Sequence, residues 1–408
     1  MSNVSSSNSQ KANVPKLRFP EFTDEWESTY LDKLLRFQNG INTSSDKYGS
    51  GIKFISVMDI LNNSYITYEN INGLIDITDD TLHNFSVNYG DILFQRSSET
   101  IEDVGKSNVY LDHRIATFGG FVIRGRKISD YDPLFLKYLL DSPIMRKHII
   151  KLGQGAQHFN IGQENLKSIK LSMPKITEQE KIGSLFKLLD KKIEYQKEII
   201  NVFKSYKRGL LSSIFEQKIC FNNKSIWMTN SLGFIFSERV ERASGSEELL
   251  SVTIENGIQK RENIETKDNS SKNKSNYKKV YINDIAYNTM RMWQGASGHS
   301  LLNGIVSPAY TVIKLNDNKN HSIKFWAFYF KHKPLIKKFQ KYSQGLTSDT
   351  WNLKYPQFAR IQVNYPPYED QIKIVNILES LDELISREEK TLEYIIDYKI
   401  QLLQKMFI

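Results

Sequence analysis

The sequence has almost no cysteine and no long hydrophobic run. Its single cysteine, Cys220, excludes an intramolecular disulfide and a zinc site built from several cysteines, which agrees with a reducing cytoplasm, where we expect the protein to act. The densest apolar run, FWAFYF at 325–330, is far shorter than the roughly 20 residues that a membrane-spanning helix needs, so no membrane partner is expected. The polar N-terminus lacks the apolar segment of a signal peptide, and residues 1–13 are therefore predicted to be a disordered leader.

The sequence also lacks the motifs that would make the chain an enzyme. It has no phosphate-binding loop for a nucleotide-driven motor, and its seven histidines show no metal-ligand spacing. The stretch NYPPY at 364–368 is close to the NPPY loop of amino-methyltransferases, but Tyr365 separates the asparagine from the first proline and destroys the spacing that this chemistry needs. No glycine-rich segment for S-adenosylmethionine precedes it. We therefore predict a non-catalytic chain with no metal and no cofactor of its own, in which NYPPY is part of a linker.

One helical segment is present twice. The stretch EQEKIGSLFKLLDKKI at 178–193 is followed 192 positions later by DQIKIVNILESLDELI at 370–385, and six of the sixteen aligned positions are identical. The same offset aligns Pro174 with Pro366. A repeat of this length is too large for a solenoid unit, so it indicates a duplicated half-protein.

Both copies continue as a long heptad pattern. From Ile182 and from Ile374, apolar residues recur at alternating spacings of four and three residues over about five heptads, which is typical of a coiled-coil helix. Residues 175–217 and 367–408 are predicted to be these two helices. Because the first helix leads into the second domain and the second helix must return, we expect an antiparallel coiled coil.

Polar residues interrupt both heptad seams at matching places. Gln196 and Lys207 in the first helix correspond to Glu388 and Lys399 in the second. In a symmetric antiparallel pair, Lys207 should meet Glu388, and Gln196 should meet Lys399. Polar seam residues penalise other registers, so these four side chains are predicted to set the register of the helix pair.

A long stretch of different sequence precedes each helix, at 14–174 and at 218–366. Short apolar runs broken by Asn, Gly and Asp predict β-strands with helical pieces between them, so we expect α+β domains with curled sheets. Weak similarities recur in the same order in both stretches, as in GDILF at 90–94 and NDIAY at 283–287. The chain is therefore predicted to be pseudo-two-fold symmetric, with two domains joined by two long helices.

Positive charge is concentrated in the second domain. Residues 218–366 contain 22 Lys and Arg against 11 Asp and Glu, whereas residues 1–174 contain 19 against 20, in a chain of net charge +9. An excess of this kind favours a polyanion-binding surface, although a solvated lysine-rich exterior gives the same count.

Taken in order, these features resemble one protein family. An Asp-Ile strand start, a small glycine-rich loop, Gln-Gly, a proline followed by Gln and Ile, and a long helix containing Leu-Asp occur twice between about Leu17 and Ile408. This pattern is similar to the specificity subunit of type I restriction–modification systems. The resemblance implies two target recognition domains, each recognising one half of a split site in double-stranded DNA, joined by helices that act as spacer and docking site.

The resemblance also implies partner subunits and their cofactors. Specificity subunits of this kind work with two methyltransferase (modification) subunits that use S-adenosylmethionine and with motor-nuclease (restriction) subunits. S-adenosylmethionine, ATP and Mg²⁺ are therefore expected in the partners and not in this chain.

Candidate DNA contacts lie in the loops after DILF and DIAY and in the loops that begin at GQG and SQG. Base edges are recognised chiefly by Arg, Lys, Asn and Gln, phosphates need only positive charge or donors, and glycines let the backbone approach a ligand. A turn-forming role is an equal possibility for any single residue. The candidates in the first domain are Gln95, Arg96, Lys106, Asn108, Gln154, Gln157, His158 and Asn160. Those in the second domain are Asn288, Arg291, Gln294, His299, Ser348, Asn352 and Lys354. Trp293 and Trp351 are predicted to be core residues rather than DNA contacts.

Two other classes of function stay open at this point. A self-contained DNA methyltransferase would need the cofactor and catalytic motifs that the sequence lacks. A coiled-coil adaptor without DNA binding would account for the helices but not for the basic segment and the paired loops. The residues favour a DNA-recognition subunit.

Overall fold

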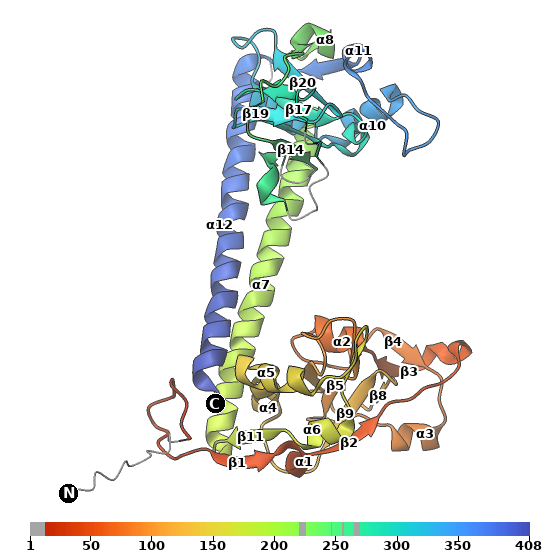
Figure 1. The fold of residues 1–408 in the computed structure, drawn as a ribbon, viewed down its shortest axis with the longest axis vertical. Helices are drawn as coiled ribbons and strands as arrows, with labels where there is room; N and C mark the ends of the chain where they lie inside the picture. The colour runs from red at the N-terminus through yellow and green to blue at the C-terminus, as the bar shows by residue number, and fades with distance from the viewer. Residues whose placement is uncertain (1–12, 220–225, 246, 255–256, 265–269, 272) are drawn as a thin grey trace, which may run out of the picture. The chain divides into compact units, whose positions relative to one another are not determined.

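The computed structural model describes residues 13–219, 226–245, 247–254, 257–264, 270–271 and 273–408 (Figure 1). Cys220 and residues 1–12 of the predicted leader lie outside this set. The last leader residue, Asn13, accepts a backbone hydrogen bond from Trp26 at 2.9 Å, so it is part of the fold and not of a disordered leader. The chain divides into two compact units: unit 1 comprises residues 1–198 and 389–408, and unit 2 comprises residues 199–388.

Unit 1 is centred on a four-stranded antiparallel sheet. Its strands are ordered β2 (Leu35–Asn39), β9 (Val122–Lys127), β5 (Ile92–Gln95) and β7 (Ser107–Val109). In β5, Ile92 and Phe94 face the main core and Leu93 faces a smaller core, which is why three consecutive residues of this strand are apolar. The remaining strands are β4 (Gly73–Ile75), β3 (Tyr48–Ile55) and β8 (Thr117–Phe118) in one sheet, and β1 (Glu27–Tyr30) with β11 (Lys170–Met173) in another.

Two consecutive helices, α4 (Pro133–Asp141) and α5 (Pro143–Leu152), pack on the main core of unit 1. Each begins with a proline after a capping residue. Asp132 accepts from the N–H of Phe135 at 2.7 Å, and Ser142 accepts from the N–H of Met145 at 3.3 Å. The short helices of this unit are α1 (Leu31–Leu34), η1 (Ser45–Lys47), α2 (Val57–Asn62), α3 (Asp79–Asn84) and α6 (Gln163–Lys167).

Unit 2 repeats this plan. Its four-stranded sheet is ordered β13 (Phe236–Glu238), β20 (Tyr310–Leu315), β17 (Ile285–Asn288) and β18 (Ser297–His299). The other strand pairs are β12 (Met228–Ser231) with β21 (Gln362–Tyr365), β14 (Leu250–Thr253) with β15 (Gly257–Lys260), and β16 (Lys278–Val280) with β19 (Gly304–Val306). Its short helices are α8 (Leu232–Ile235), η2 (Arg261–Asn263), η3 (Met292–Gln294), α9 (Ile323–Tyr329), α10 (Lys333–Tyr342) and α11 (Tyr355–Phe358). The expectation of two α+β domains is confirmed.

Asp91 and Asp284, which precede the equivalent strands β5 and β17, make the same hydrogen bond in both units. Asp91 accepts a hydrogen bond from the N–H of Asn88 at 3.0 Å, and Asp284 accepts one from the N–H of Tyr281 at 2.8 Å. Both carboxylates are buried and also contact an arginine. Each aspartate thus closes the turn that leads into β5 or β17. The backbone N–H and the arginine are the partners that a buried carboxylate needs.

The two long helices predicted from the heptads are present as α7 (Ile176–Phe215) and α12 (Tyr368–Met406). In unit 1, Phe186 in α7 packs on Phe407, just after α12, with ring centroids 5.7 Å apart. In unit 2, Phe215 at the end of α7 lies in one core with Ile374 near the start of α12. The helices therefore run antiparallel in each unit, as expected (Figure 1). No helix among the described residues is both long and apolar enough to cross a membrane.

The predicted register of the helix pair is wrong. Lys207 forms an ion pair with Asp382 in unit 2, and Lys399 forms one with Asp190 in unit 1. Each aspartate directly follows a seam leucine, Leu381 or Leu189, so the seam positions that face each other have residue numbers that add up to 588. The predicted pairs, Lys207–Glu388 and Gln196–Lys399, add up to 595, which is a shift of seven residues.

The error has a physical reason. A heptad pattern is satisfied equally well when one helix shifts by seven residues, so it defines the seam but not the register. A lysine at a seam position can also lay its aliphatic stem over apolar neighbours and place its charge at the flank. The flanking aspartates that receive these lysines, Asp190 and Asp382, are the identical aspartates of the repeat.

Candidate nucleic-acid interface

Two loops of unit 1 come together beside the end of β5. Loop A1 (96–106) follows β5, and loop B1 (153–160) follows α5. Short strands within them, β6 (Ser97–Ser98) and β10 (Phe159–Asn160), pair antiparallel, and the N–H of Ile161 donates to the carbonyl of Arg96 at 3.0 Å. The structure therefore unites the two loops that the sequence analysis singled out into one surface.

A polar depression of about 600 Å³ lies where these loops meet. Its polar lining comes from Asn39, Arg96, Gln154, Asn160, Gln163, Glu164 and Asn165. The Arg96 guanidinium donates to the carbonyl of Gly120 at 3.5 Å and has no carboxylate partner among the described residues, whereas Glu164 is paired with Lys167 at 2.7 Å. An unpaired arginine among amide groups offers the donors and acceptors that base edges require.

Two of the predicted contacts in unit 1 are wrong. Gln95 and Asn108 are buried in the fold. The Gln95 amide donates to the carbonyl of Ser97 at 2.9 Å, and the Asn108 amide donates to the carbonyls of Ile60 at 3.0 Å and Asn63 at 2.7 Å. Both residues belong to strands, β5 and β7, whose side chains point into the core at these positions, so they stabilise the fold and do not reach a ligand.

The other candidates of unit 1 are at the surface. Lys106 is half-exposed and pairs with Asp103 at 2.6 Å, which lowers the pKa of that aspartate and offsets the lysine charge. Gln157 and His158 are exposed on loop B1. Asn160 is also exposed and donates to the carbonyl of His158 at 3.2 Å.

Gly155 in loop B1 has a structural role within the loop itself. Gly155 has a φ of +135°, and a Cβ there would lie 2.0 Å from the carbonyl oxygen of His158. Gly345 in the equivalent loop of unit 2 has a φ of +142° and a Cβ there would lie 2.6 Å from the backbone of Thr350. These glycines are needed because each loop folds back on itself.

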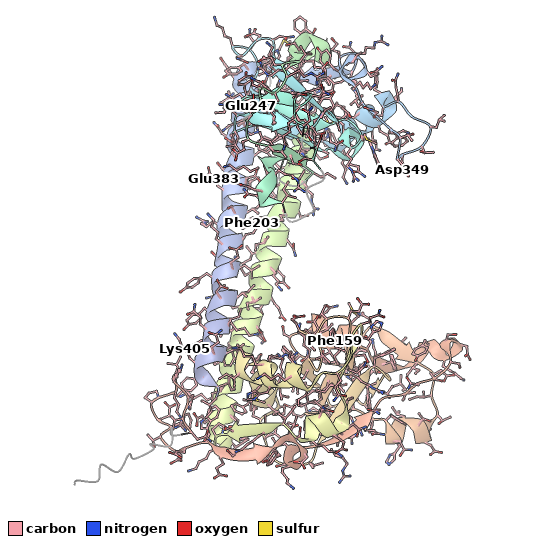
Figure 2. All side chains as sticks on the ribbon, in the orientation of Figure 1. Phe159, Phe203, Glu247, Asp349, Glu383 and Lys405 are labelled. Carbon is pink, nitrogen blue, oxygen red and sulfur yellow. The ribbon has the colours of Figure 1, made fainter. Side chains whose placement is uncertain are left out.

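Unit 2 has an equivalent surface. Loop A2 (289–296) follows β17, and loop B2 (343–352) follows α10 and carries Asp349 (Figure 2). The N–H of Leu353 donates to the carbonyl of Thr289 at 2.8 Å, which is the counterpart of the bond between Ile161 and Arg96.

The candidates of unit 2 divide into exposed and inward-facing side chains. Arg291, Ser348 and Lys354 are exposed. Asn288 is half-buried, and its side-chain oxygen accepts from the N–H of Met290 at 3.0 Å. The remaining three, Gln294, His299 and Asn352, each have a buried polar atom without a hydrogen-bond partner among the described residues. Burial lowers the pKa of His299, so its imidazole is neutral at pH 7.

The two tryptophans of these loops are not core residues. Trp293 and Trp351 are half-buried and pack on each other edge to face, with ring centroids 5.2 Å apart. The Trp293 indole N–H donates to the carbonyl of Met290 at 2.9 Å. The pair therefore joins loop A2 to loop B2 at the surface.

Two cations that anchor these loops, Lys331 and Arg146, could not be predicted from the sequence. Lys331, which precedes α10, donates to the carbonyls of Ile254 at 3.0 Å, Gly295 at 2.6 Å and Ser297 at 2.8 Å. Burial lowers its pKa to about 8. In unit 1, Arg146 in α5 donates to the carbonyls of Glu102 and Val104 at 2.8 Å each. Backbone carbonyls leave no trace in the sequence, so no pattern could have pointed to either contact.

The NYPPY stretch is structural. Asn364 and Tyr365 belong to β21, which pairs with β12. The Tyr365 hydroxyl accepts from the Asn230 amide at 2.8 Å, and the carbonyl of Pro366 accepts from the Gln371 amide at 3.0 Å. These contacts agree with a linker that leads into α12. No group of three or more His, Cys, Asp or Glu side chains suited to a metal ion occurs in the described part of the chain.

The geometry defines a class of protein: a duplicated α+β chain in which each unit joins a loop surface to an antiparallel helix pair. A family model for the type I restriction modification DNA specificity domain matches residues 23–205 and 236–395. The chain belongs to this family of specificity subunits of type I restriction–modification systems.

Individual relatives cover nearly the whole chain. It is 22% identical over 411 residues to the putative type I restriction enzyme MjaX specificity subunit of Methanocaldococcus jannaschii, covering 95% of this chain and 93% of the relative. The S subunit of a type I restriction–modification system from M. genitalium has a similar fold, with a TM-score of 0.54, 16% identity and coverage of 97% and 99%. A chain from a structural study of complex assembly and conformational transition of the type I system has a TM-score of 0.57, 12% identity and coverage of 94% and 97%.

Proposed function

We propose that this chain recognises a bipartite site in double-stranded DNA, with one half-site for each unit. Residues 14–174 and 218–366 would be the two target recognition domains. The observation that carries the proposal is the repeated junction of loops A1 and B1 and of loops A2 and B2 beside equivalent strands, with different side chains in each. A shared backbone with different polar side chains is what two readers of different half-sites require.

The proposed contacts are the candidates on these loops, or next to them, whose side chains are at least partly exposed. Arg96 and Arg291 are the arginines of the two surfaces, and arginine is the side chain best suited to guanine in the major groove. The supporting side chains are Lys106, Gln154, Gln157, His158, Asn160, Asn288, Ser348 and Lys354. Gln294, His299 and Asn352 are left out of the proposed contacts, because one polar atom of each is buried.

The helices carry a repeated exposed patch that fits two copies of one partner. In unit 2, Val202 and Tyr206 on α7 are 64% and 60% exposed, and in unit 1, Tyr394 and Tyr398 on α12 are 70% and 46% exposed. The second pair follows the first by 192 residues, so the patches are equivalent. We assign them to two methyltransferase subunits, because large apolar side chains exposed at helical spacing suit a partner helix.

Catalysis is assigned to the partners. The methyltransferase subunits would bind S-adenosylmethionine, and the restriction subunits would bind ATP and Mg²⁺. This chain would supply recognition and docking only.

The test is to sequence methylated DNA from a host that carries the partner genes with and without this gene. A bipartite methylated motif that disappears when the gene is deleted supports the proposal. Methylation by the isolated chain would instead identify a self-contained methyltransferase, and an unchanged methylation pattern would leave only an adaptor role.

The docking patches have a separate test. Replacing Tyr206 by Ser should remove one methyltransferase subunit from the assembly, and replacing Tyr398 by Ser should remove the other, as measured by mass in solution. Full assembly by the variant that carries both substitutions would rule out these patches as docking sites.

A further inference from the structure

Helices α5 and α10 are equivalent but share only two residues. Aligned through the buried residues Ile149 and Phe339, their ten residues read PIMRKHIIKL and KPLIKKFQKY. They are identical only at Lys147 with Lys337 and at Lys151 with Lys341. Each helix leads directly into loop B1 or loop B2, with Lys151 and Lys341 two residues before the loop and Lys147 and Lys337 about one turn further back.

These four lysines are free to bind an external anion. All four are exposed, and none has a side-chain hydrogen bond or ion pair within the described part of the chain. Neither helix contains an acidic residue. In each helix the two lysines follow the two buried residues by two positions, which places them on the face opposite the core.

The presence of the same lysine pair in both units indicates a ligand feature that both half-sites share. Side chains that recognise bases must differ between two half-sites, and the loop residues do differ. The sugar–phosphate backbone is the same in both half-sites, so its contacts can be identical. Exposed cations retained at equivalent positions of otherwise different helices meet this condition.

We propose that Lys147 with Lys151, and Lys337 with Lys341, bind DNA phosphates without regard to sequence and hold the adjoining loop at the duplex. The inference rests on the proposed DNA-recognition function. Stabilisation of the helix dipole accounts for Lys151 and Lys341 in the last turn, but not for Lys147 and Lys337 one turn earlier.

The experiment uses the full chain assembled with its methyltransferase subunits. One variant carries Lys147→Gln and Lys151→Gln, and a second carries Lys337→Gln and Lys341→Gln. A control of equal charge change carries Lys314→Gln and Lys319→Gln, two exposed lysines of unit 2 that belong neither to α10 nor to loops A2 and B2. Affinity is measured on a target duplex and on a scrambled duplex over a range of salt concentrations.

Loss of two phosphate contacts should lower the affinity for both duplexes by the same factor, about ten- to a hundredfold at about 0.1 M salt, and should reduce the slope of log K against log salt by about 1.8. The methylated motif should not change. Arginine at the same two positions should restore binding, and the control should bind like the unsubstituted chain.

Three outcomes would overturn the inference: salt slopes equal to that of the control, a loss confined to the target duplex, or a loss of methyltransferase subunits that explains the weaker binding. If the unsubstituted complex binds the duplex and the lysine variants bind equally well, only this inference fails. If the unsubstituted complex does not bind duplex DNA, the proposed function itself fails.

Discussion

The two units join their loops by the same backbone bond but by different side chains. In unit 1, strands β6 and β10 pair, and Ser97 donates to Asn160. In unit 2, Trp293 and Trp351 make the connection through their rings. Both units share one backbone hydrogen bond between the loops. The N–H of Ile161 donates to the carbonyl of Arg96 in unit 1, and the N–H of Leu353 donates to the carbonyl of Thr289 in unit 2. Because the backbone holds the loops together, the side chains of each unit are free to suit a different ligand.

The helix pair is also held differently in the two units. In unit 1, Asp190 is buried and accepts from the Tyr138 hydroxyl at 2.6 Å as well as from its lysine partner. Burial and the Asp190 carboxylate raise the pKa of Tyr138, so its hydroxyl remains a donor. In unit 2, Asp382 is exposed, and Lys207 lies 5.0 Å from the ring of Phe328, which has no hydroxyl. The same ion pair is therefore expected to matter more in unit 1.

The largest expected effect follows from this difference. Replacing Asp190 by Ala strands a lysine and a tyrosine hydroxyl in a largely buried site and should lower the free energy of unfolding of unit 1 by about 3 kcal/mol. Replacing Asp382 by Ala should cost at most about 1 kcal/mol, because that pair is exposed. Denaturant unfolding monitored within each unit compares the two variants. Equal losses of unfolding free energy in the two variants would show that burial does not determine the strength of the ion pair.

An intermediate effect is expected from the loop anchors. Replacing Lys331 by Met leaves three carbonyls without their donor and should weaken binding of the half-site of unit 2 by about 2 kcal/mol. Replacing Arg146 by Met should do the same for unit 1 only. Affinity for duplexes altered in one half-site measures both effects, with Lys331→Arg as the conservative control. A variant that weakens both half-sites alike would show that the anchors act on general stability.

The smallest effect concerns a residue that the sequence analysis placed at the interface. Replacing Asn108 by Ala should lower the free energy of unfolding by about 1–2 kcal/mol, because the buried bond to the carbonyl of Ile60 and the partly buried bond to that of Asn63 are lost. The recognised sequence should stay the same. The matched control is Gln157→Ala on exposed loop B1, which should leave stability unchanged. A changed methylation motif in the Asn108 variant would show that this residue contributes to DNA recognition after all.

Periodicity and repetition predict the large elements of this fold well. The heptads from Ile182 and Ile374 identify α7 and α12, and chain order identifies their antiparallel pairing, because both follow from hydrophobic burial along one helix face. The register was beyond this logic, since a shift of seven residues buries the same seam. The contact of Lys207 with Asp382 depends on side-chain reach, which a pattern does not contain.

The sequence predicted which loops come together at the candidate site better than it predicted which of their residues are at the surface. Arg96 and Gln154 line one depression, because both loops flank the end of β5. Gln95 and Asn108 were predicted wrongly because they lie in strands β5 and β7, in which every residue is buried. The lysine pairs of α5 and α10 are visible in the sequence, but only the structure shows which positions of the two helices are equivalent and exposed.

The central claim is that each unit recognises its own half-site, and methylated-motif sequencing of single variants tests it most directly. Each gene variant, Arg96→Ala or Arg291→Ala, is placed in a host with the partner genes. We predict that Arg96→Ala relaxes or abolishes recognition of one half of the bipartite motif and leaves the other half intact, and that Arg291→Ala does the converse. A change of both halves by either substitution would contradict the account.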